Sequence, residues 1–443
     1  MDNLFSKSQK RRDKGHAASF RQFLSGSQIQ VAQLDGAVID LHGVILRQFL
    51  DERIRLFVDP AGFCVGLPDG GAAHIVHNVV AIFGLHQTVV TGGAGFIGSC
   101  FILQRIANGD SVLNLDKLTY AGNPENLSSI ADHPNYYFVQ GDIADKSSTA
   151  KIFRDFKPEF VVNFAAESHV DHSILEPEAF LQTNVIGTTR LLSSALDYWN
   201  HLCKAGKDSF RFLHVSTDEV FGSLGKKDPS FTESSPYRPN SPYSASKASA
   251  DHFVRAFNRT YGLPTLITHC SNNYGPRQYP EKLIPLMVLN AVAGKELPVY
   301  GDGANIRDWI HVEDHCSAID LVVRNSAPGA VYNIGGNSEF SNLEIVRAIT
   351  EILDGVNPRK DGCSYFDQIH FVKDRPGHDF RYAINSNKIF KELGWKPSYS
   401  FQAGLRETVL WYLNNPEWIK NVKNKHYSDW MKLNYEDQRS RSD

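Results

Sequence analysis

Residues 89–98, Val-Val-Thr-Gly-Gly-Ala-Gly-Phe-Ile-Gly, constrain the fold of this chain more than any other stretch. Thr88-Val89-Val90 predicts a short buried strand, glycines follow at 92, 95 and 98, and the apolar pattern then changes to a helical period. In a doubly wound parallel sheet, such a turn lets the backbone approach a pyrophosphate closely at the N-terminus of the next helix. The stretch therefore predicts a dinucleotide-binding α/β domain.

The flanking residues decide between a dinucleotide turn and an ordinary glycine-rich turn. One helical face after the turn is apolar and comprises Ile97, Phe101, Ile102 and Ile106. The next apolar run ends on Asp116, eighteen residues after Gly98, and an acid near this spacing accepts the ribose hydroxyls of a dinucleotide. Because a carboxylate repels a 2′-phosphate, Asp116 favours NAD over NADP, although Lys117 beside it weakens this preference.

Composition narrows the class of protein further. The 443 residues suffice for one large or two interleaved domains, and 42% apolar with 21% charged residues is an ordinary globular composition. A net charge of −3 and the lack of a long basic run in the body of the chain argue against nucleic-acid binding. Six cysteines form no Cys-x-x-Cys pair, so neither a metal site nor a disulfide framework is supported. No apolar run reaches the ~20 residues of a membrane span, and a cytoplasmic protein is expected.

Residues 1–86 precede the predicted cofactor strand, which usually opens its domain in such folds. Residues 59–71 are rich in Gly and Pro, and apolar and charged residues mix over 29–58 in a pattern compatible with a strand or a short helix. We therefore prefer an accessory or poorly ordered leader, or a start codon placed too far upstream, over an extra functional domain.

Strand and helix patterns alternate from residue 87 to about residue 275, as in a parallel sheet with right-handed crossovers. Predicted strands end in small or polar residues at Gly141-Asp142-Ile143, Ala165-Ala166, Ser216-Thr217-Asp218-Glu219 and Ser271-Asn272-Asn273. Ligands bind at the carboxyl ends of such strands. We expect the site along this edge of the sheet.

The pattern loosens after about residue 275 into shorter strands, helices and turns rich in Pro and Gly. We interpret residues 276–432 as a smaller, interleaved α/β lobe that binds the substrate, with residues 310–312 crossing back to the main sheet. Residues 433–443 are predicted to be a frayed polar tail. The predicted fold class is α/β, a doubly wound parallel Rossmann sheet over residues 87–275 with this smaller lobe.

Ser241-Pro242-Tyr243 opens another predicted helix, with Ser241 as N-cap and Pro242 in the first turn. Tyr243 and Lys247 are four residues apart and share one face. A tyrosine must lose its proton to act as a base, and a nearby ammonium together with a nicotinamide cation favours the phenolate. Tyr-x-x-x-Lys also occurs by chance on helix surfaces, but behind a dinucleotide fingerprint it predicts a catalytic base.

Thr217-Asp218-Glu219 is the more discriminating motif. Two adjacent acids at a strand end point in different directions, so two carboxylates can serve different atoms of one substrate. On these residues alone, an acidic turn or a helix cap is an equally good explanation.

These motifs resemble the extended short-chain dehydrogenases/reductases, and within them the nucleotide-sugar 4,6-dehydratases, from about Thr88 to about Trp430. Seven segments carry the resemblance: Asp116-Lys-Leu-Thr-Tyr-Ala-Gly-Asn123, Ala165-Ala-Glu-Ser-His-Val-Asp171, Ser216-Thr-Asp-Glu-Val-Phe-Gly222, Asn272-Asn-Tyr-Gly-Pro276, Pro280-Glu-Lys-Leu-Ile-Pro285, Asn305-Ile-Arg-Asp-Trp309 and Asp374-Arg-Pro-Gly-His-Asp379. Relatives that act on other sugars usually lack the Thr-Asp-Glu triplet.

The resemblance implies conversion of dTDP-glucose to its 4-keto-6-deoxy sugar with NAD as cofactor. The C6 hydroxyl of a hexose leaves readily only when the C5 hydrogen is acidic, and this requires a ketone at C4. Oxidation at C4 therefore comes first, water leaves across C5 and C6, and the same hydride returns to C6. The chemistry itself does not exclude a GDP- or CDP-sugar.

By resemblance, Tyr243 takes the C4 hydroxyl proton, while Lys247 holds the ribose and lowers the tyrosine pKa. Thr217 would hydrogen-bond the C4 oxygen, Asp218 would protonate the departing C6 hydroxyl, and Glu219 would remove the C5 proton. Asp218 must then hold a proton near neutral pH beside a glutamate that lacks one, so the two environments must differ.

The resemblance also assigns binding residues. NAD contacts fall on Gly92, Gly95, Phe96, Ile97, Gly98, Asp116, Lys117, Leu118, Thr119, Asp142, Ile143, Phe164, Ala165, Ala166, Thr183, Tyr243, Lys247 and Asn273. Nucleotide-sugar contacts fall on Ser168, Thr217, Asn272, Lys282, Leu283, Pro298, Val299, Tyr300, Arg307, Asn342, Asp374, Arg375 and His378. Arg307 and Arg375 suit a diphosphate, since a guanidinium donates two parallel hydrogen bonds, although a surface salt bridge would also explain either one. A homodimer through paired helices that include the Tyr243 helix is expected.

The chain departs from the family pattern in its leader of about 86 residues, in a short segment between Gly222 and Ser241, and in His172, where arginine is common. The main competing hypothesis is a nucleotide-sugar 4-epimerase or decarboxylase that uses only the Tyr-Lys-NAD part, which would leave Asp218 and Glu219 without a role. A non-catalytic NAD-binding regulator is a second alternative, but such proteins commonly lose the tyrosine or the lysine, and both are present here.

Overall fold

The computed structural model describes residues 86–374 and 377–422, together with four short strands nearer the N-terminus. These strands form two antiparallel pairs, β1 (Asp40–Leu41) with β2 (Val44–Ile45) and β3 (Arg55–Asp59) with β4 (Gly62–Gly66). The other residues of the predicted leader and the whole predicted tail lie outside the described residues. Residues 87–131 and the described residues from 137 onward belong to one compact unit, which contains the site.

A seven-stranded parallel sheet organises this unit, in the order β14-β10-β9-β8-β5-β6-β7. Its strands are β5 (Gln87–Thr91), β6 (Ser111–Asp116), β7 (Tyr136–Gln140), β8 (Phe160–Asn163), β9 (Arg211–Thr217), β10 (Thr265–Cys270) and β14 (Val331–Ile334). The chain builds outward from β5 to β7 and then returns to place β8 on the other side of β5. The order therefore reverses between β5 and β8, which confirms the doubly wound fold and locates its ligand crevice.

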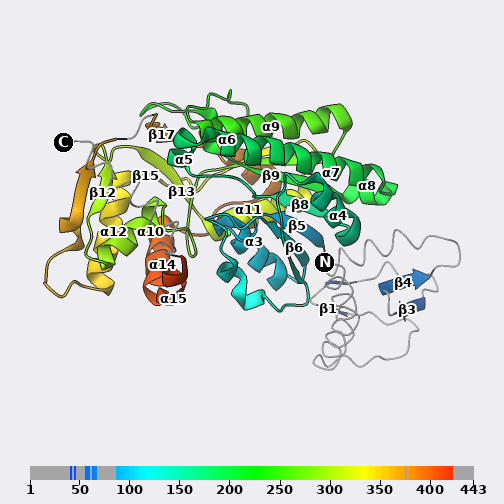
Figure 1. Ribbon diagram of the computed structural model, residues 1–443, viewed down its shortest axis with the longest axis horizontal. Coiled ribbons are helices and arrows are strands. Elements are labelled where there is room, and N and C mark those ends of the chain that lie inside the picture. Colours follow the sequence, from blue (N-terminus) through cyan, green and yellow to red (C-terminus); the bar gives the residue numbers. More distant parts are fainter. Residues whose placement is uncertain are drawn as a thin grey trace. The chain divides into compact units, whose positions relative to one another are not determined.

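Helices cover both faces of the sheet (Figure 1). On one face, α3 (Phe96–Ala107) packs beside α11 (Val312–Asn325), and on the other α4 (Lys146–Phe156), α7 (Thr188–Asn200) and α9 (Pro242–Tyr261) lie in a row. Four short elements, α5 (Val170–Leu175), α6 (Pro177–Phe180), the π-helix η3 (Leu181–Gly187) and α8 (Lys204–Ser209), complete this second layer. Apart from the half-exposed edge strand β7, the sheet strands are buried between the two layers, which explains their largely apolar composition.

The smaller lobe contains a mixed sheet and a two-stranded parallel pair. In the mixed sheet β13 (Ile306–His311) pairs with β11 (Asn272–Tyr274), β15 (Glu339–Ser341) and β17 (Arg381–Tyr382), and in the pair β12 (Leu297–Tyr300) lies against β16 (Ile369–Val372). The prediction that residues 310–312 return to the main sheet was wrong, because β13 runs beside β11 instead. The crossover helix α11 follows β13, and the strand it delivers to the edge beside β10 is β14.

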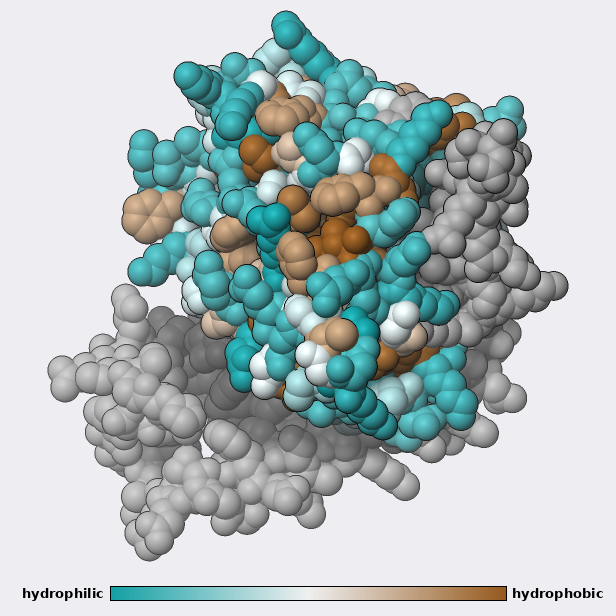
Figure 2. Space-filling model, turned by 90° about the vertical axis from the view of Figure 1, so that its left-hand side faces the viewer, coloured by the Kyte–Doolittle hydropathy of each residue, from teal (hydrophilic) through white to brown (hydrophobic). Residues whose placement is uncertain are grey.

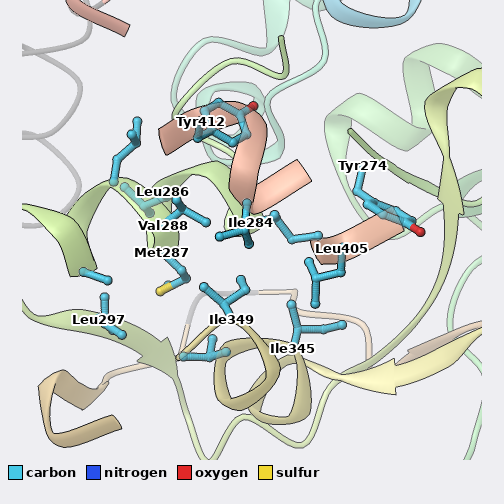
Figure 3. Close-up of a cluster of buried hydrophobic side chains, with 14 of the residues drawn as sticks. Tyr274, Ile284, Leu286, Met287, Val288, Leu297, Ile345, Ile349, Leu405 and Tyr412 are labelled. Atoms are coloured by element: carbon cyan, nitrogen blue, oxygen red, sulfur yellow. The ribbon is translucent and has the colours of Figure 1, made fainter. Parts of the chain in front are cut away.

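A separate hydrophobic cluster holds the lobe together (Figure 3). It lies between α10 (Leu283–Val292), α12 (Asn342–Val356) and α14 (Phe401–Asn414), and Ile284, Met287, Ile349 and Leu405 all point into it. The remaining elements are η2 (Pro124–Ile130), η5 (Tyr365–Gln368), α13 (Asn387–Leu393) and α15 (Pro416–Val422). Helix α10 is apolar on every side, which agrees with its nearly complete burial.

The outer face of this lobe is mostly hydrophilic, with a group of apolar side chains near the middle of the view in Figure 2. Across the residues that the structure describes, no helix combines the length and the apolarity needed to cross a bilayer.

Candidate active site

A cavity of about 320 Å³ runs along the carboxyl ends of the sheet strands. Its walls come from the glycine turn after β5, from Asp116 at the end of β6, and from the segments that follow β7, β8, β9 and β10. This is the edge that the sequence pattern predicted for the ligand.

The glycine turn forms one end of this cavity. Gly92 has a φ of +68°, and a Cβ there would lie 2.7 Å from the backbone of Ala165. A Cβ on Gly98 would lie 2.4 Å from the carbonyl oxygen of Gly92. Helix α3 starts after Gly95 with no side-chain cap and no acid in its first turn, and Phe96 and Ile97 of that turn line the cavity. Its first N–H groups therefore suit an anion, and the turn fits a dinucleotide pyrophosphate.

Asp116 supplies the acceptor expected at the far end of β6. The side chain is buried, and its two oxygens accept hydrogen bonds of 2.8 Å from the backbone N–H groups of Ala94 and Leu118. Burial raises the pKa of Asp116. A carboxylate has about four lone-pair positions, so two remain for ribose hydroxyls. The adjacent Lys117 pairs with Asp142 at 2.8 Å instead of neutralising Asp116, which keeps this end of the cavity suited to NAD.

Tyr243 and Lys247 both lie in the first turns of α9 and line the cavity. Ser241 is the N-cap and forms a capping box with Ser244, as the sequence predicted for the helix start. The Lys247 ammonium donates to the carbonyl oxygen of Val215 at 2.8 Å, and burial lowers the pKa of Lys247 to about 8.

In the chain alone, the pKa of Tyr243 does not fall as the sequence argument expects. Burial and the charge of Glu219 raise the pKa of Tyr243 well above its ordinary value, while a hydrogen bond with Thr217 acts in the opposite direction. Tyr243 therefore holds its proton in the chain alone.

Asp218 and Glu219 begin the short helix η4 (Asp218–Phe221) directly after β9, and their environments differ. Asp218 is 2% exposed, and its Oδ2 atom has no hydrogen-bond partner among the described residues. Burial, followed by the charge of Glu219, raises the pKa of Asp218 well above its ordinary value. Glu219 is only half-buried. Asp218 can therefore hold a proton next to a second carboxyl group that contacts solvent.

The cavity gathers most of the predicted site. It is lined by Gly92, Gly95, Phe96, Ile97, Gly98, Asp116, Lys117, Thr119, Asp142, Ile143, Phe164, Ala165, Ala166, Ser168, Thr183, Thr217, Asp218, Glu219, Tyr243, Lys247, Asn272, Asn273 and Lys282. The predicted residues that do not line it are Leu118, Leu283, Pro298, Val299, Tyr300, Arg307, Asn342, Asp374 and His378. Arg375 lies outside the described residues.

Several of the predicted residues outside the cavity lie together in the smaller lobe. Nδ1 of His378 is 2.6 Å from a carboxylate oxygen of Asp374, and its ring centroid is 6.1 Å from that of Tyr300. Arg307 is buried, donates to the carbonyl oxygen of Asp379 at 3.0 Å and lies 4.3 Å over the Tyr382 ring. It is therefore not an exposed surface salt bridge.

Some residues that line the cavity escaped the sequence argument, and Glu281 is the clearest case. It is 6% exposed, accepts a hydrogen bond from the Tyr120 hydroxyl at 3.2 Å, and burial raises its pKa to about 7. The other unpredicted lining residues include Glu167, Cys270, Ser271, Gln278 and Tyr279. Glu281 lies in the Pro280–Pro285 segment that carries the resemblance and is adjacent to the predicted substrate contact Lys282, and this position could have indicated that it lines the site.

The fold and the residues of this cavity place the chain in the class of NAD-dependent enzymes that act on nucleotide sugars. Comparisons with known proteins agree with this class. A family model described as GDP-mannose 4,6 dehydratase matches residues 89–408. The dTDP-glucose 4,6-dehydratase of Xanthomonas campestris pv. campestris (strain B100) is 55% identical over 339 residues, which cover 76% of this chain and 96% of the relative. The dTDP-glucose 4,6-dehydratase 1 of Escherichia coli (strain K12) is 53% identical over 359 residues, which cover 79% and 99%. The chain belongs to this 4,6-dehydratase family.

Solved structures match equally well. The dTDP-glucose 4,6-dehydratase of Bacillus anthracis in complex with NAD has a TM-score of 0.67 and 49% identity, covering 76% of this chain and 99% of that one. A UDP-glucose 4-epimerase of Thermotoga maritima shares the fold with a TM-score of 0.65 but only 29% identity over 74% of this chain and 99% of its own. The higher identity thus lies with the dehydratases.

Proposed function

We propose that this chain is a dTDP-glucose 4,6-dehydratase, which converts dTDP-glucose to dTDP-4-dehydro-6-deoxyglucose and water. Its cofactor NAD is regenerated in each turnover. One observation carries the proposal. Thr217, Asp218 and Glu219 line the same cavity as Tyr243, Lys247 and the dinucleotide turn. The residues for oxidation at C4 and those for elimination across C5 and C6 are therefore held in one space.

The oxidation half needs a base for the C4 hydroxyl and a fixed cofactor. When bound, NAD supplies the acceptor for the C4 hydride and later its donor. The α3 N-terminus and Asp116 would hold the cofactor, and Lys247 would hold its ribose. Tyr243 takes the hydroxyl proton, and Thr217, which hydrogen-bonds Tyr243, fixes the C4 oxygen beside that tyrosine.

The elimination half needs one carboxylic acid and one carboxylate. Glu219 removes the C5 proton, and the electron pair of that bond forms the C5–C6 double bond. The C6 hydroxyl leaves with the proton of Asp218 as water. The elevated pKa of Asp218 supports this assignment, because an acid that is ionised at neutral pH has no proton to give.

The smaller lobe is proposed to bind the nucleotide diphosphate. Arg307 and Arg375 suit the two phosphates. The cluster of Tyr300, Asp374 and His378, with Pro298, Val299, Asn342 and Leu283, would surround the nucleoside. Lys282 donates to the Ser168 carbonyl at 3.2 Å and so links the lobe to the segment after β8, where the sugar would lie.

The competing functions account for less of the site. A 4-epimerase needs no acid at C6, so it would leave the buried carboxyl of Asp218 without a purpose, and an unpaired buried carboxyl is costly. A non-catalytic regulator would not need Tyr243 and Lys247 to remain together in the cavity. A 4,6-dehydratase acting on another nucleotide sugar differs only in the part that the smaller lobe binds.

A homodimer is proposed through the α9 side of the molecule, in the cytoplasm. Large apolar side chains on neighbouring elements remain exposed there, including Leu175 (58%), Leu181 (51%) and Phe253 (42%). They come from α5, η3 and α9, which pack together, and Figure 1 shows α5, α6 and α9 side by side. A second copy would cover them. Light scattering should give twice the chain mass, and Phe253→Glu should give the monomer; a wild-type monomer would contradict the proposal.

The direct test is to incubate the purified protein with dTDP-glucose in deuterated water and to analyse the sugar by mass spectrometry and NMR. We expect a 4-keto-6-deoxy sugar with deuterium at C5, because the proton removed by Glu219 exchanges with solvent before C5 is protonated again. dTDP-galactose would indicate an epimerase instead. NAD binding without any conversion, also in a protein that lacks residues 1–84, would favour the non-catalytic alternative.

A further inference from the structure

A buried carboxylate that the proposed reaction does not use lies one helical turn beyond Lys247. Asp251 is 1% exposed. Its Oδ2 atom accepts hydrogen bonds from the Ser216 hydroxyl at 2.8 Å and the Tyr237 hydroxyl at 3.1 Å, and it lies 3.2 Å from Nε2 of His269. Burial alone would raise the pKa of Asp251, but the contact with His269 and the charge of Lys247 keep it below its ordinary value. Asp251 is therefore a fixed negative charge.

The other oxygen of Asp251 and the Lys247 ammonium lie beside the same nitrogen of one imidazole ring. Oδ1 is 3.6 Å from Nε2 of His214 and has no hydrogen-bond partner among the described residues. The same Nε2 atom is 3.3 Å from the Lys247 Nζ atom. Burial and the Lys247 charge lower the pKa of His214 to about 3, so the ring is neutral and the positive charge stays on the lysine. Asn163, 3.0 Å from Nδ1, fixes the ring from its other side.

The energetics indicate that this carboxylate is kept for a purpose. Burial of a charge is costly, and a well-packed apolar residue at such a position is often more stabilising than an ion pair. Three separate segments nevertheless contribute Ser216, Tyr237 and His269 to hold the carboxylate ionised. Of these neighbours, none contacts the substrate in the proposed reaction.

Two neighbouring groups raise the pKa of Lys247 and so help it to keep its proton: Asp251 on α9 and the Cys270 thiol on β10. A third neighbour, His214 on β9, is neutral. Burial raises the pKa of Cys270 to about 12, so this thiol carries no charge near neutral pH. Asp251 is thus the anion that opposes the burial of the Lys247 ammonium.

We propose that Asp251 is a positioning residue for the oxidation step, and that its buried carboxylate, together with the neutral His214 ring whose Nε2 atom lies beside both groups, holds the Lys247 ammonium in place and keeps it protonated. This inference rests on the proposed function, because it concerns the lysine that the C4 oxidation requires. Asp251 itself touches neither substrate nor cofactor.

The test isolates the oxidation step in the holoenzyme. dTDP-6-deoxyglucose has no C6 hydroxyl to lose, so its C4 alcohol can only be oxidised to the ketone: the hydride reduces bound NAD to NADH, and the hydroxyl proton goes to Tyr243. The rate of NADH appearance is followed by absorbance as a function of pH. The rate should fall as the pH rises and Lys247 loses its proton, and in Asp251→Asn this alkaline fall should move to lower pH by about one unit or more, since an opposite charge close by shifts a pKa by that amount.

Controls separate this role from a structural one. Tyr237→Phe removes one hydrogen-bond donor but no charge from Asp251, so its alkaline fall should stay at the wild-type pH. His214→Leu, which removes the polar ring beside both groups, should move the fall to lower pH, and His214→Gln, whose amide can donate to Asp251 and accept from Lys247, should restore it. If thermal melting shows that Asp251→Asn does not fold, the two His214 variants still test the inference.

The outcomes are distinct. A slower Asp251→Asn enzyme with an unmoved alkaline fall would overturn the inference and leave a structural role, and so would an unmoved fall in His214→Leu. A wild-type holoenzyme that forms no NADH from this substrate would instead contradict the proposed function.

Discussion

The main sheet and the smaller lobe build their parts of the site in different ways. Around the sheet, the cavity is lined by short runs that follow consecutive strands, such as Gly92 to Gly98 and Thr217 to Glu219. In the lobe, Tyr300, Arg307 and His378 come from β12, from β13 and from the segment before β17, and none of them lines the cavity. A parallel sheet gathers ligands at one edge through its own geometry, whereas the lobe must assemble its residues through long-range pairing.

The two regions also have separate hydrophobic clusters. One lies under the sheet and includes Val89, Leu113 and Val161, and the other joins α10, α12 and α14 in the lobe. Chemistry should therefore depend on the sheet, and binding of the nucleotide on the lobe. The following changes are ordered by expected effect.

Asp218→Asn should have the largest effect, and it should fall on one half of the chemistry. An amide cannot protonate the leaving hydroxyl, so turnover of dTDP-glucose should decrease by about 10²–10⁴-fold, the usual contribution of a general acid. C4 oxidation needs no acid at C6, so NADH should accumulate after mixing. Stopped-flow absorbance measures it, with Glu219→Gln as the matched variant. Loss of NADH formation in Asp218→Asn would show that the two halves are not separable.

The pH dependence of elimination gives the sign of the Asp218 shift. Asp218 works protonated, and burial raises its pKa, so elimination should be supported at neutral pH and lost as the pH rises through that elevated pKa. A carboxyl group with an ordinary pKa would lose the activity already in mildly acidic solution. If kcat already falls as the pH rises through the mildly acidic range and is lost before neutral pH, the assignment is contradicted.

Gly92→Ala tests the cofactor end against a matched glycine of the lobe. Gly92 and Gly294 have nearly the same φ, +68° and +67°, but an added Cβ meets the Ala165 backbone at 2.7 Å in the first and nothing within 4 Å in the second. Gly294→Ala should cost only the roughly 1–2 kcal/mol of left-handed strain. Gly92→Ala should cost more and should also lose NAD, as measured by thermal melting and by the cofactor content of the purified protein. Equal effects would mean that the turn has no special packing role.

Ile349→Ala addresses the lobe cluster drawn in Figure 3. Ile349 is fully buried there, so the truncation should lower the free energy of unfolding by about 2–5 kcal/mol. Phe371→Ala is the control, because Phe371 is 52% exposed and a surface change usually costs within about 0.5 kcal/mol. NAD content should not change in either protein. Cofactor loss in Ile349→Ala would show that the two clusters are coupled.

Arg307→Lys should have the smallest effect and should appear in substrate binding. Lysine keeps the charge but loses the forked donors that match two phosphate oxygens, so KM for dTDP-glucose should rise by about 10-fold, or 1.4 kcal/mol, with little change in kcat. Lys295→Arg, at an exposed position of the lobe, is the control. A lower kcat with an unchanged KM would place Arg307 with Asp218 instead of the diphosphate.

Local patterns in the sequence predicted the sheet half well. The strand that ends at Thr91, the uncapped start of α3 and the capped start of α9 all depend on neighbouring residues, so their chemistry is visible in the chain. The assignment of residues 310–312 failed because β13 and β14 are both short strands, and only their pairing partners show which of them joins the main sheet.

The support of the site was not predictable for the same reason. The carboxylate of Asp251 on α9 is surrounded by His214 on β9, Tyr237 in a loop and His269 on β10. No spacing in the sequence indicates that these residues meet. Glu281 was missed because its role arises from burial beside Tyr120, which lies 161 positions away in the chain. Such contacts are products of the fold and require the structure.

The most direct test of the central claim uses dTDP-glucose labelled with deuterium at C4, incubated in ordinary water and analysed by NMR. If one cavity carries out oxidation, elimination and reduction in sequence, the deuterium removed from C4 should be found on C6 of the 4-keto-6-deoxy product. In a mixture with unlabelled substrate, each deuterium should stay in the molecule that carried it at the start. Deuterium that returns to C4 of a hexose with an intact C6 hydroxyl would identify an epimerase and contradict the account.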